Sequence, residues 1–87
     1  MSFRNSKVVI VGAGNVGSTT AFSIVSQGLC EDVCLIDINN EVAVGQALDM
    51  QDAVYFMNRN MRVHAGGYEE CSDADIVVIT AAAPMPK

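Results

Sequence analysis

The sequence predicts an α/β fold built on a parallel sheet of about four strands with flanking helices. Four short apolar runs, at residues 7–11, 33–38, 61–65 and 76–80, alternate with segments of helical spacing. The first, second and fourth runs hold consecutive apolar residues rather than an apolar–polar alternation, so we expect strands buried on both faces of a parallel sheet. Successive parallel strands are joined by right-handed crossovers, and the helices should therefore cover the sheet.

The first helix is predicted at residues 15–27. Val16, Thr20 and Ile24 recur at a spacing of four residues, which places them on one side of a helix. Gly28 follows directly and is expected to end the helix, because glycine adopts the left-handed conformation that closes a helical C-terminus.

The second helix is predicted at residues 41–56. Asn39 or Asn40 can cap it, and Glu41 in its first turn favours the positive end of the helix dipole. The polar segment 69–75 has room for one further helical turn before the fourth strand.

Composition limits the classes of partner. With 87 residues, the chain is long enough for one domain. Its formal charge is −5 and it has no basic run, so a nucleic acid is not expected as a partner. No apolar run is long enough for a signal segment or a membrane span, and we expect a cytoplasmic protein without a membrane partner.

The cysteines give no sign of a metal site. Cys30, Cys34 and Cys71 are odd in number and form no C-x-x-C pair, so we expect buried thiols and neither a disulfide scaffold nor bound metal. His64 is expected to be a partly buried strand histidine, because no partner stands at catalytic spacing. Asp49 is expected on a solvated helix face rather than at a metal.

A glycine motif between the first strand and the first helix carries the predicted chemistry. Gly12, Gly14 and Gly17 fit G-x-G-x-x-G, the fingerprint of Rossmann-type dinucleotide-binding domains. Gly12 should permit a tight turn, Gly14 should let a pyrophosphate approach the backbone, and Gly17 should let the helix pack closely on the strand. The start of the helix, with Asn15, then offers N–H groups to the phosphates.

Asp37 indicates which dinucleotide is bound. It stands 20 residues after Gly17, near the end of the second strand, where a carboxylate accepts hydrogen bonds from the adenosine ribose. The same carboxylate would repel a 2′-phosphate, and residues 38–40 contain no Lys or Arg. The sequence therefore favours NAD over NADP.

The end of the fourth strand is the other candidate ligand segment. Thr80 is followed by three alanines at 81–83, and ligands of open α/β sheets bind at the carboxyl ends of the strands. The small residues could let a ribose or nicotinamide pass over the backbone, or they could form no more than a turn.

Together these segments resemble the L-lactate/L-malate dehydrogenase family, and the lactate branch in particular. The segments that carry the resemblance are VIVGAGNVGS at 9–18, LID at 35–37, GQALDMQDA at 45–53 and DADIVVITA at 73–81. The third separates this family from other dinucleotide folds. The resemblance implies hydride transfer between NAD and a small 2-hydroxy or 2-oxo acid. Combined with the motif, it gives these cofactor-binding candidates: Gly12, Gly14, Asn15, Val16, Gly17, Asp37, Ile38, Val42, Tyr68, Thr80, Ala81, Ala82 and Ala83.

Two positions depart from the family pattern. The family usually has glycine at the position of Ala82, where a positive φ would cost alanine about 1 kcal/mol. The position that sets substrate choice aligns with Met85, where lactate enzymes carry Gln and malate enzymes Arg. Methionine cannot pair with a second carboxylate, so we expect an apolar 2-oxo acid larger than pyruvate.

The resemblance also implies what lies outside the chain. The family's catalytic His, its Asp partner and its substrate-binding arginines come after the segment matched here. We therefore expect residues 1–87 to be the N-terminal part of a dinucleotide-binding domain, with no catalytic residue and the catalytic domain absent. The family forms dimers and tetramers through the helix containing Ala47 and Leu48, which predicts a homodimer or homotetramer. A non-catalytic NAD-sensing module is the alternative.

Overall fold

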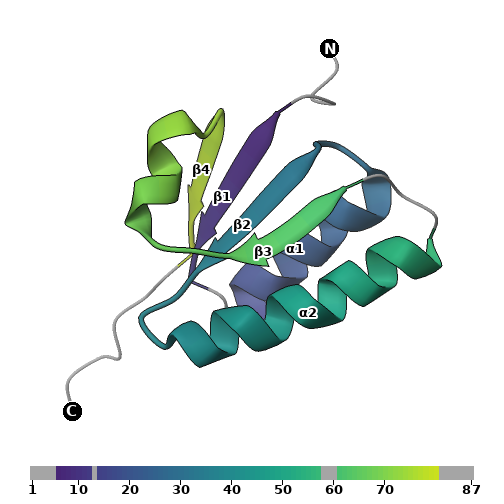
Figure 1. Cartoon of the computed structure of the whole chain (residues 1–87), viewed down its shortest axis with the longest axis horizontal. Helices are drawn as coiled ribbons and strands as arrows, with labels where there is room; N and C mark the ends of the chain where they lie inside the picture. The colour runs from purple at the N-terminus through teal and green to yellow at the C-terminus, as the bar shows by residue number, and fades with distance from the viewer. Residues whose placement is uncertain (1–5, 13, 58–60, 81–87) are drawn as a thin grey trace.

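The computed structural model describes residues 6–12, 14–57 and 61–80. Four strands form one sheet in the order β3-β2-β1-β4, and every pair is parallel (Figure 1). The strands are β1 Lys7–Val11, β2 Asp32–Ile36, β3 Arg62–Ala65 and β4 Ile76–Ile79. The predicted α/β fold with about four parallel strands is confirmed.

The first strand of the described chain lies inside the sheet. Val9 of β1 pairs with Cys34 of β2 on one side and with Val77 of β4 on the other. Val9 and Ile10 have no exposed surface. A strand with neighbours on both sides and cover on both faces has few solvent-facing positions, which explains why β1 is apolar from Val8 to Val11.

Two helices cover one face of the sheet, and a short helix covers part of the other. Alternate strand residues, Ile10 and Leu35 among them, pack with α1 (Asn15–Gln27) and α2 (Asn40–Phe56). Val9 and Ile36 point to the opposite face, where the 3₁₀ helix η1 (Tyr68–Asp73) provides cover. Figure 1 shows α1 and α2 side by side and η1 away from them, near β4 and β1.

The helix boundaries follow local signals. Gly28 ends α1 at φ 63° and its N–H donates to the carbonyls of Ile24 and Val25, as predicted. Asn39 rather than Asn40 caps α2, because its side chain accepts a hydrogen bond from the N–H of Glu41. The strand predicted at 33–38 ends at Ile36, so Asp37 and Ile38 lie just beyond it.

The prediction that the fourth strand is buried was wrong. Ile76, Val77 and Ile79 of β4 are 41%, 41% and 72% exposed. The strand lies at the edge of the described sheet, where β1 is its one neighbour and the residues placed by the structure leave its outer side uncovered. Consecutive apolar residues indicate a strand but do not say which strand lies at an edge.

The cysteines and the last turns of α2 differ in how deeply their side chains are buried. Cys30 and Cys34 are buried free thiols, as predicted, whereas Cys71 on η1 is only half-buried because this helix lies on the outside of the sheet. The apolar end of α2 divides: Met50 and Val54 enter the core, and the aromatic residues that follow them stay exposed. Across the described residues, neither helix combines the length and the apolar character needed to cross a bilayer.

Candidate cofactor site

The candidate site lies at the edge of the sheet where the carboxyl ends of the strands meet. Val11, the last residue of β1, pairs with Ile36 at the end of β2 and with Ile79 at the end of β4. The segments that follow these three strands therefore start next to one another, at the lower left of Figure 1. Ligands of open α/β sheets bind at this edge.

Two of the three motif glycines are required by the fold itself. Gly12 has φ 102°, a conformation that L side chains rarely adopt, and its N–H donates to the carbonyl of Ile36 at 2.7 Å. A Cβ on Gly17 would lie 1.6 Å from the carbonyl oxygen of Gly12. The roles predicted for Gly12 in the turn and Gly17 in close packing are thus confirmed.

Thr80 fixes the same turn from the neighbouring strand. Its hydroxyl donates to the carbonyl of Gly12 at 2.8 Å, and its backbone N–H donates to the carbonyl of Val11 at 2.9 Å. The sequence indicated Thr80 only as a residue near the ligand. The structure adds an anchoring contact that joins positions 68 residues apart.

Gly14 differs from the other two glycines. Its φ of −71° and ψ of −162° are open to any residue, and a Cβ there would meet no described atom within 4 Å. Gly14 is the N-cap of α1, which has no side-chain cap bond and no acidic residue in its first turn. The first-turn N–H groups of a helix have no partner within it, so this end can receive an anion.

Asp37 is held at the edge by a local contact. The backbone N–H of Asn39 donates to its Oδ1 at 2.9 Å, which fixes the carboxylate just beyond β2. Because β1 and β2 end side by side, Asp37 follows the strand next to the glycine turn. The predicted pairing of a glycine turn with an acid on the neighbouring strand is present.

Four apolar side chains around this edge are exposed; we call them the apolar rim. Val16, Ile38, Val42 and Tyr68 are 67%, 98%, 37% and 64% exposed. They come from the starts of three helices and the loop after β2. All four are residues that the sequence analysis singled out as cofactor contacts. Exposed apolar groups beside a few polar ones are typical of small-molecule sites.

Lys7 holds the helix that carries Tyr68. Its Nζ lies 2.6 Å from Glu70 Oε1 and 2.6 Å from Asp73 Oδ1, both on η1. The hydrogen bonds from Lys7 lower the pKa of both carboxyls and raise the pKa of the lysine. The sequence gave no sign of this contact, because its partners are more than 60 residues apart.

Some predicted residues cannot be placed. Ala81, Ala82, Ala83 and the substrate candidate Met85 lie outside the described residues. Asn15 begins α1 as predicted.

Comparison with known proteins decides the family. A family model described as the NAD-binding domain of lactate/malate dehydrogenase matches residues 6–87. The chain belongs to the lactate/malate dehydrogenase family. It is therefore an NAD-binding domain, as the glycine turn and Asp37 indicated, and the match gives no support to a sensing module.

Individual members of the family agree. The chain is 52% identical over 87 residues to L-lactate dehydrogenase 3 of Bacillus cereus, covering 100% of this chain and 27% of that protein. A minor L-lactate dehydrogenase from Enterococcus mundtii matches with a TM-score of 0.88 at 43% identity, over 94% of this chain and 26% of that one. Malate dehydrogenase of Archaeoglobus fulgidus, solved with NADH, matches with a TM-score of 0.83 at 32% identity, over 92% and 28%. The chain thus spans about a quarter of the length of these relatives.

Proposed function

We propose that the NAD pyrophosphate binds at the N-terminus of α1. Because Gly14 has no Cβ, the pyrophosphate can come close to the backbone there. The observation that carries this proposal is the difference between the three motif glycines. The fold explains Gly12 by its positive φ and Gly17 by its contact with a carbonyl. At Gly14 no described atom lies close enough to require a glycine. The close approach of a ligand would account for a glycine at this position.

The remaining contacts follow from the geometry of the edge. Asp37 would accept hydrogen bonds from the adenosine ribose, and its charge would disfavour a 2′-phosphate. The adenine would lie among the apolar rim, next to Ile38 and Val42. Bound NAD supplies a nicotinamide that accepts or donates a hydride, and this chain's own residues bind and orient it.

The contact between Thr80 and the glycine turn bears on the direction of the cofactor. Thr80 joins β4 to this turn, so a cofactor whose pyrophosphate lies on α1 would extend past Thr80. Met85, the substrate candidate, lies outside the described residues.

For the whole protein we propose hydride transfer between NAD and a small 2-hydroxy or 2-oxo acid. The relatives named above are lactate and malate dehydrogenases, and this chain corresponds to about a quarter of each. The groups that bind substrate and transfer its proton would come from residues outside this chain. Met85 favours an apolar substrate, because a thioether offers neither a charge nor a strong hydrogen bond.

We also propose a cytoplasmic homodimer or homotetramer with α2 in the subunit interface. Leu48, Tyr55 and Phe56 of α2 are 64%, 74% and 92% exposed. Large apolar side chains gathered on one helix are typical of interfaces. Sedimentation of the whole protein should give a dimer or tetramer, and Phe56→Glu should shift it toward the monomer.

Replacement of Gly14 tests the cofactor site. Gly14→Ala should fold as the parent does, because the new Cβ meets no described atom, and should bind NADH at least tenfold more weakly. Gly45→Ala is the matched control, since its Cβ also meets nothing within 4 Å but lies on α2. Calorimetric NADH titration of the three chains is the measurement. Equal affinity in the Gly14 and Gly45 variants would contradict the proposed position of the pyrophosphate.

A rate comparison tests the substrate. Steady-state kcat/KM of the whole protein should be higher for branched 2-oxo acids than for pyruvate, and lowest for oxaloacetate. A preference for oxaloacetate would refute the role given to Met85.

A further inference from the structure

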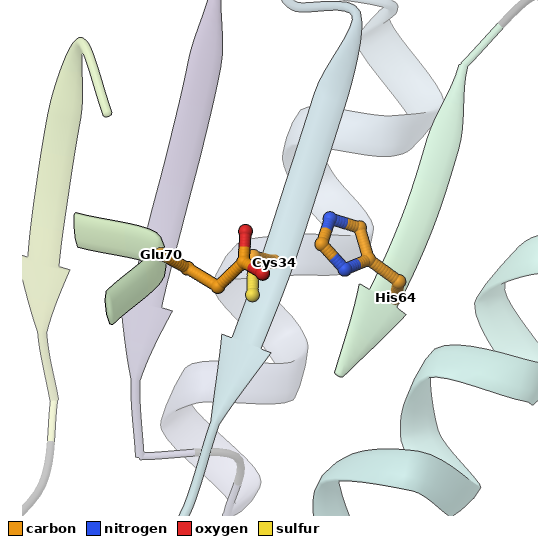
Figure 2. A group of neighbouring side chains, drawn as sticks. All are labelled: Cys34, His64 and Glu70. Carbon is orange, nitrogen blue, oxygen red and sulfur yellow. The ribbon is translucent and has the colours of Figure 1, made fainter. Parts of the chain in front are cut away.

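Three side chains that bind metals in other proteins meet on the face of the sheet covered by η1. Cys34 comes from β2, His64 from β3 and Glu70 from η1, and one ligand atom of each lies within 4.8 Å of the other two. Figure 2 shows the His64 ring extending toward Cys34 from one side and the Glu70 carboxyl group reaching it from the other. We propose that Cys34, His64 and Glu70 form a binding site for a thiophilic divalent cation such as Zn²⁺.

The sheet itself brings two of the ligands together. Cys34 and His64 are direct partners in the parallel pairing of β2 and β3. Residues paired across neighbouring strands point to the same face of a sheet, so both side chains point to the same face. Their proximity is therefore a property of the backbone register and does not depend on a flexible loop.

His64 is oriented as metal-binding histidines are. Its Nε2 lies 2.8 Å from Asp32 Oδ1, a buried oxygen that accepts no regular hydrogen bond among the described residues. Arg62 NH2 also lies 3.3 Å from this nitrogen, but the carboxylate is closer and the arginine side chain is 68% exposed. In the tautomer that carries its proton on Nε2, beside this carboxylate, the Nδ1 lone pair is available to a cation. A carboxylate behind a ligating imidazole is a frequent second contact at zinc sites.

Glu70 is also held in place. Lys7 Nζ contacts its Oε1 at 2.6 Å, and this leaves Oε2 as the oxygen for a cation. Gly66 provides the space: a Cβ there would lie 2.7 Å from Glu70 Cγ and 3.0 Å from Cys34 Sγ. A side chain at residue 66 would push the Glu70 side chain away from the thiol.

The charges suit a divalent ion. A Cys34 thiolate and the Glu70 carboxylate together neutralise it, and Lys7 is balanced by its second contact, with Asp73. A sulfur ligand selects metals with high thiolate affinity over Mg²⁺ or Ca²⁺, which prefer oxygen ligands.

Binding needs only a small movement. Ligand atoms of a tetrahedral zinc site lie about 3.5 Å apart, so the three groups would close by roughly 1 Å. The half-buried His64 and Glu70 side chains can make this adjustment. A fourth position remains for water. The bound ion would join η1 to β2 and β3 independently of the proposed cofactor site.

Cobalt titration of the reduced chain tests the proposal. Co²⁺ should bind with a stoichiometry of one and give a thiolate-to-cobalt charge-transfer band that Zn²⁺ abolishes. Cys34→Ser should remove the band, and Cys30→Ser, at a second buried cysteine outside the cluster, should keep it. Glu70→Gln should weaken Zn²⁺ binding at least tenfold, whereas Glu69→Gln on the same helix should change it less than twofold.

A stability measurement covers the case in which a cysteine variant does not fold. Zn²⁺ should raise the Tm of the parent chain and of Glu69→Gln, but not of Glu70→Gln. A band that survives Cys34→Ser or is lost equally in Cys30→Ser overturns the site, and so does an equal Tm shift in the two glutamate variants. None of these readouts requires NAD, so a failed metal site and a failed cofactor site are distinguishable.

Discussion

The two long helices begin at the same edge of the sheet but begin in opposite ways. At α2, the Asn39 side chain accepts a hydrogen bond from the N–H of Glu41 at 3.1 Å, and Glu41 adds a negative charge to the first turn. At α1, Gly14 is the N-cap, with no side-chain cap bond and no acidic residue in the first turn. The start of α2 is closed by its own residues, whereas the start of α1, which we call its open end, has no such side-chain cap among the described residues.

This difference between the two helix ends supports the proposed phosphate position at α1. A side-chain cap stabilises a helix by about 1 kcal/mol, and α1 forgoes that contribution. Within the described residues, α1 carries no compensating acid. A phosphate group can supply both the hydrogen-bond acceptors and the negative charge that α2 obtains from Asn39 and Glu41.

The largest effect on stability is expected at Gly17, where the start of α1 packs against the glycine turn. Gly17→Ala would place a Cβ 1.6 Å from the Gly12 carbonyl oxygen, and the backbone would have to move. We expect a loss of about 3 kcal/mol or more in the free energy of unfolding, measured by urea denaturation. Gly45→Ala, where a Cβ has space, should not destabilise the chain. A loss below about 1 kcal/mol in Gly17→Ala would mean that α1 does not approach the turn this closely.

A second substitution gives the start of α1 the acidic residue that α2 has in its first turn. Val16→Glu places an acid in the first turn of α1, at a side chain that is 67% exposed. Folding should be retained, and NADH affinity should fall about tenfold because the carboxylate repels the pyrophosphate. Glu41→Gln removes the corresponding acid from α2 and should leave NADH affinity within twofold. Fluorescence titration of NADH measures both, and an unchanged affinity in Val16→Glu would count against a phosphate at this helix end.

The smallest effect is expected at the closed end. Asn39→Ala removes the cap of α2 and should cost about 1 kcal/mol in the free energy of unfolding. NADH affinity should hardly change, because the backbone N–H of residue 39 still donates to Asp37. Thermal unfolding and NADH titration of the same samples test this. If Asn39→Ala lost much of its NADH affinity while its stability stayed unchanged, the start of α2 rather than that of α1 would be the end that matters for the cofactor.

The sequence predicted those features that depend on neighbouring residues. Gly12 and Gly17 marked a turn whose tightness the structure confirms, and Gly28 marked the end of α1. The choice between Asn39 and Asn40 stayed open, because either amide can cap a helix. The observed hydrogen bond to Glu41 decides it.

Features that depend on strand register could not be predicted in this way. The hydroxyl of Thr80 meets Gly12 only because β4 pairs with β1, and Cys34 meets His64 only because β2 pairs with β3 in this register. The apolar run of β4 gave no indication that this strand lies at the edge. Each of these facts is set by contacts between distant segments.

The position of β1 between β2 and β4 also affects the order in which its strand contacts can form during folding. Its second neighbour is the last strand of the described chain, so β1 waits for a partner almost 70 residues away in sequence. Contacts of such long range slow folding, because chain entropy is lost before they form. Thr80, which clamps the Gly12 carbonyl, arrives with that last strand. During synthesis the glycine turn is therefore made well before Thr80, the residue whose hydroxyl bonds to its carbonyl.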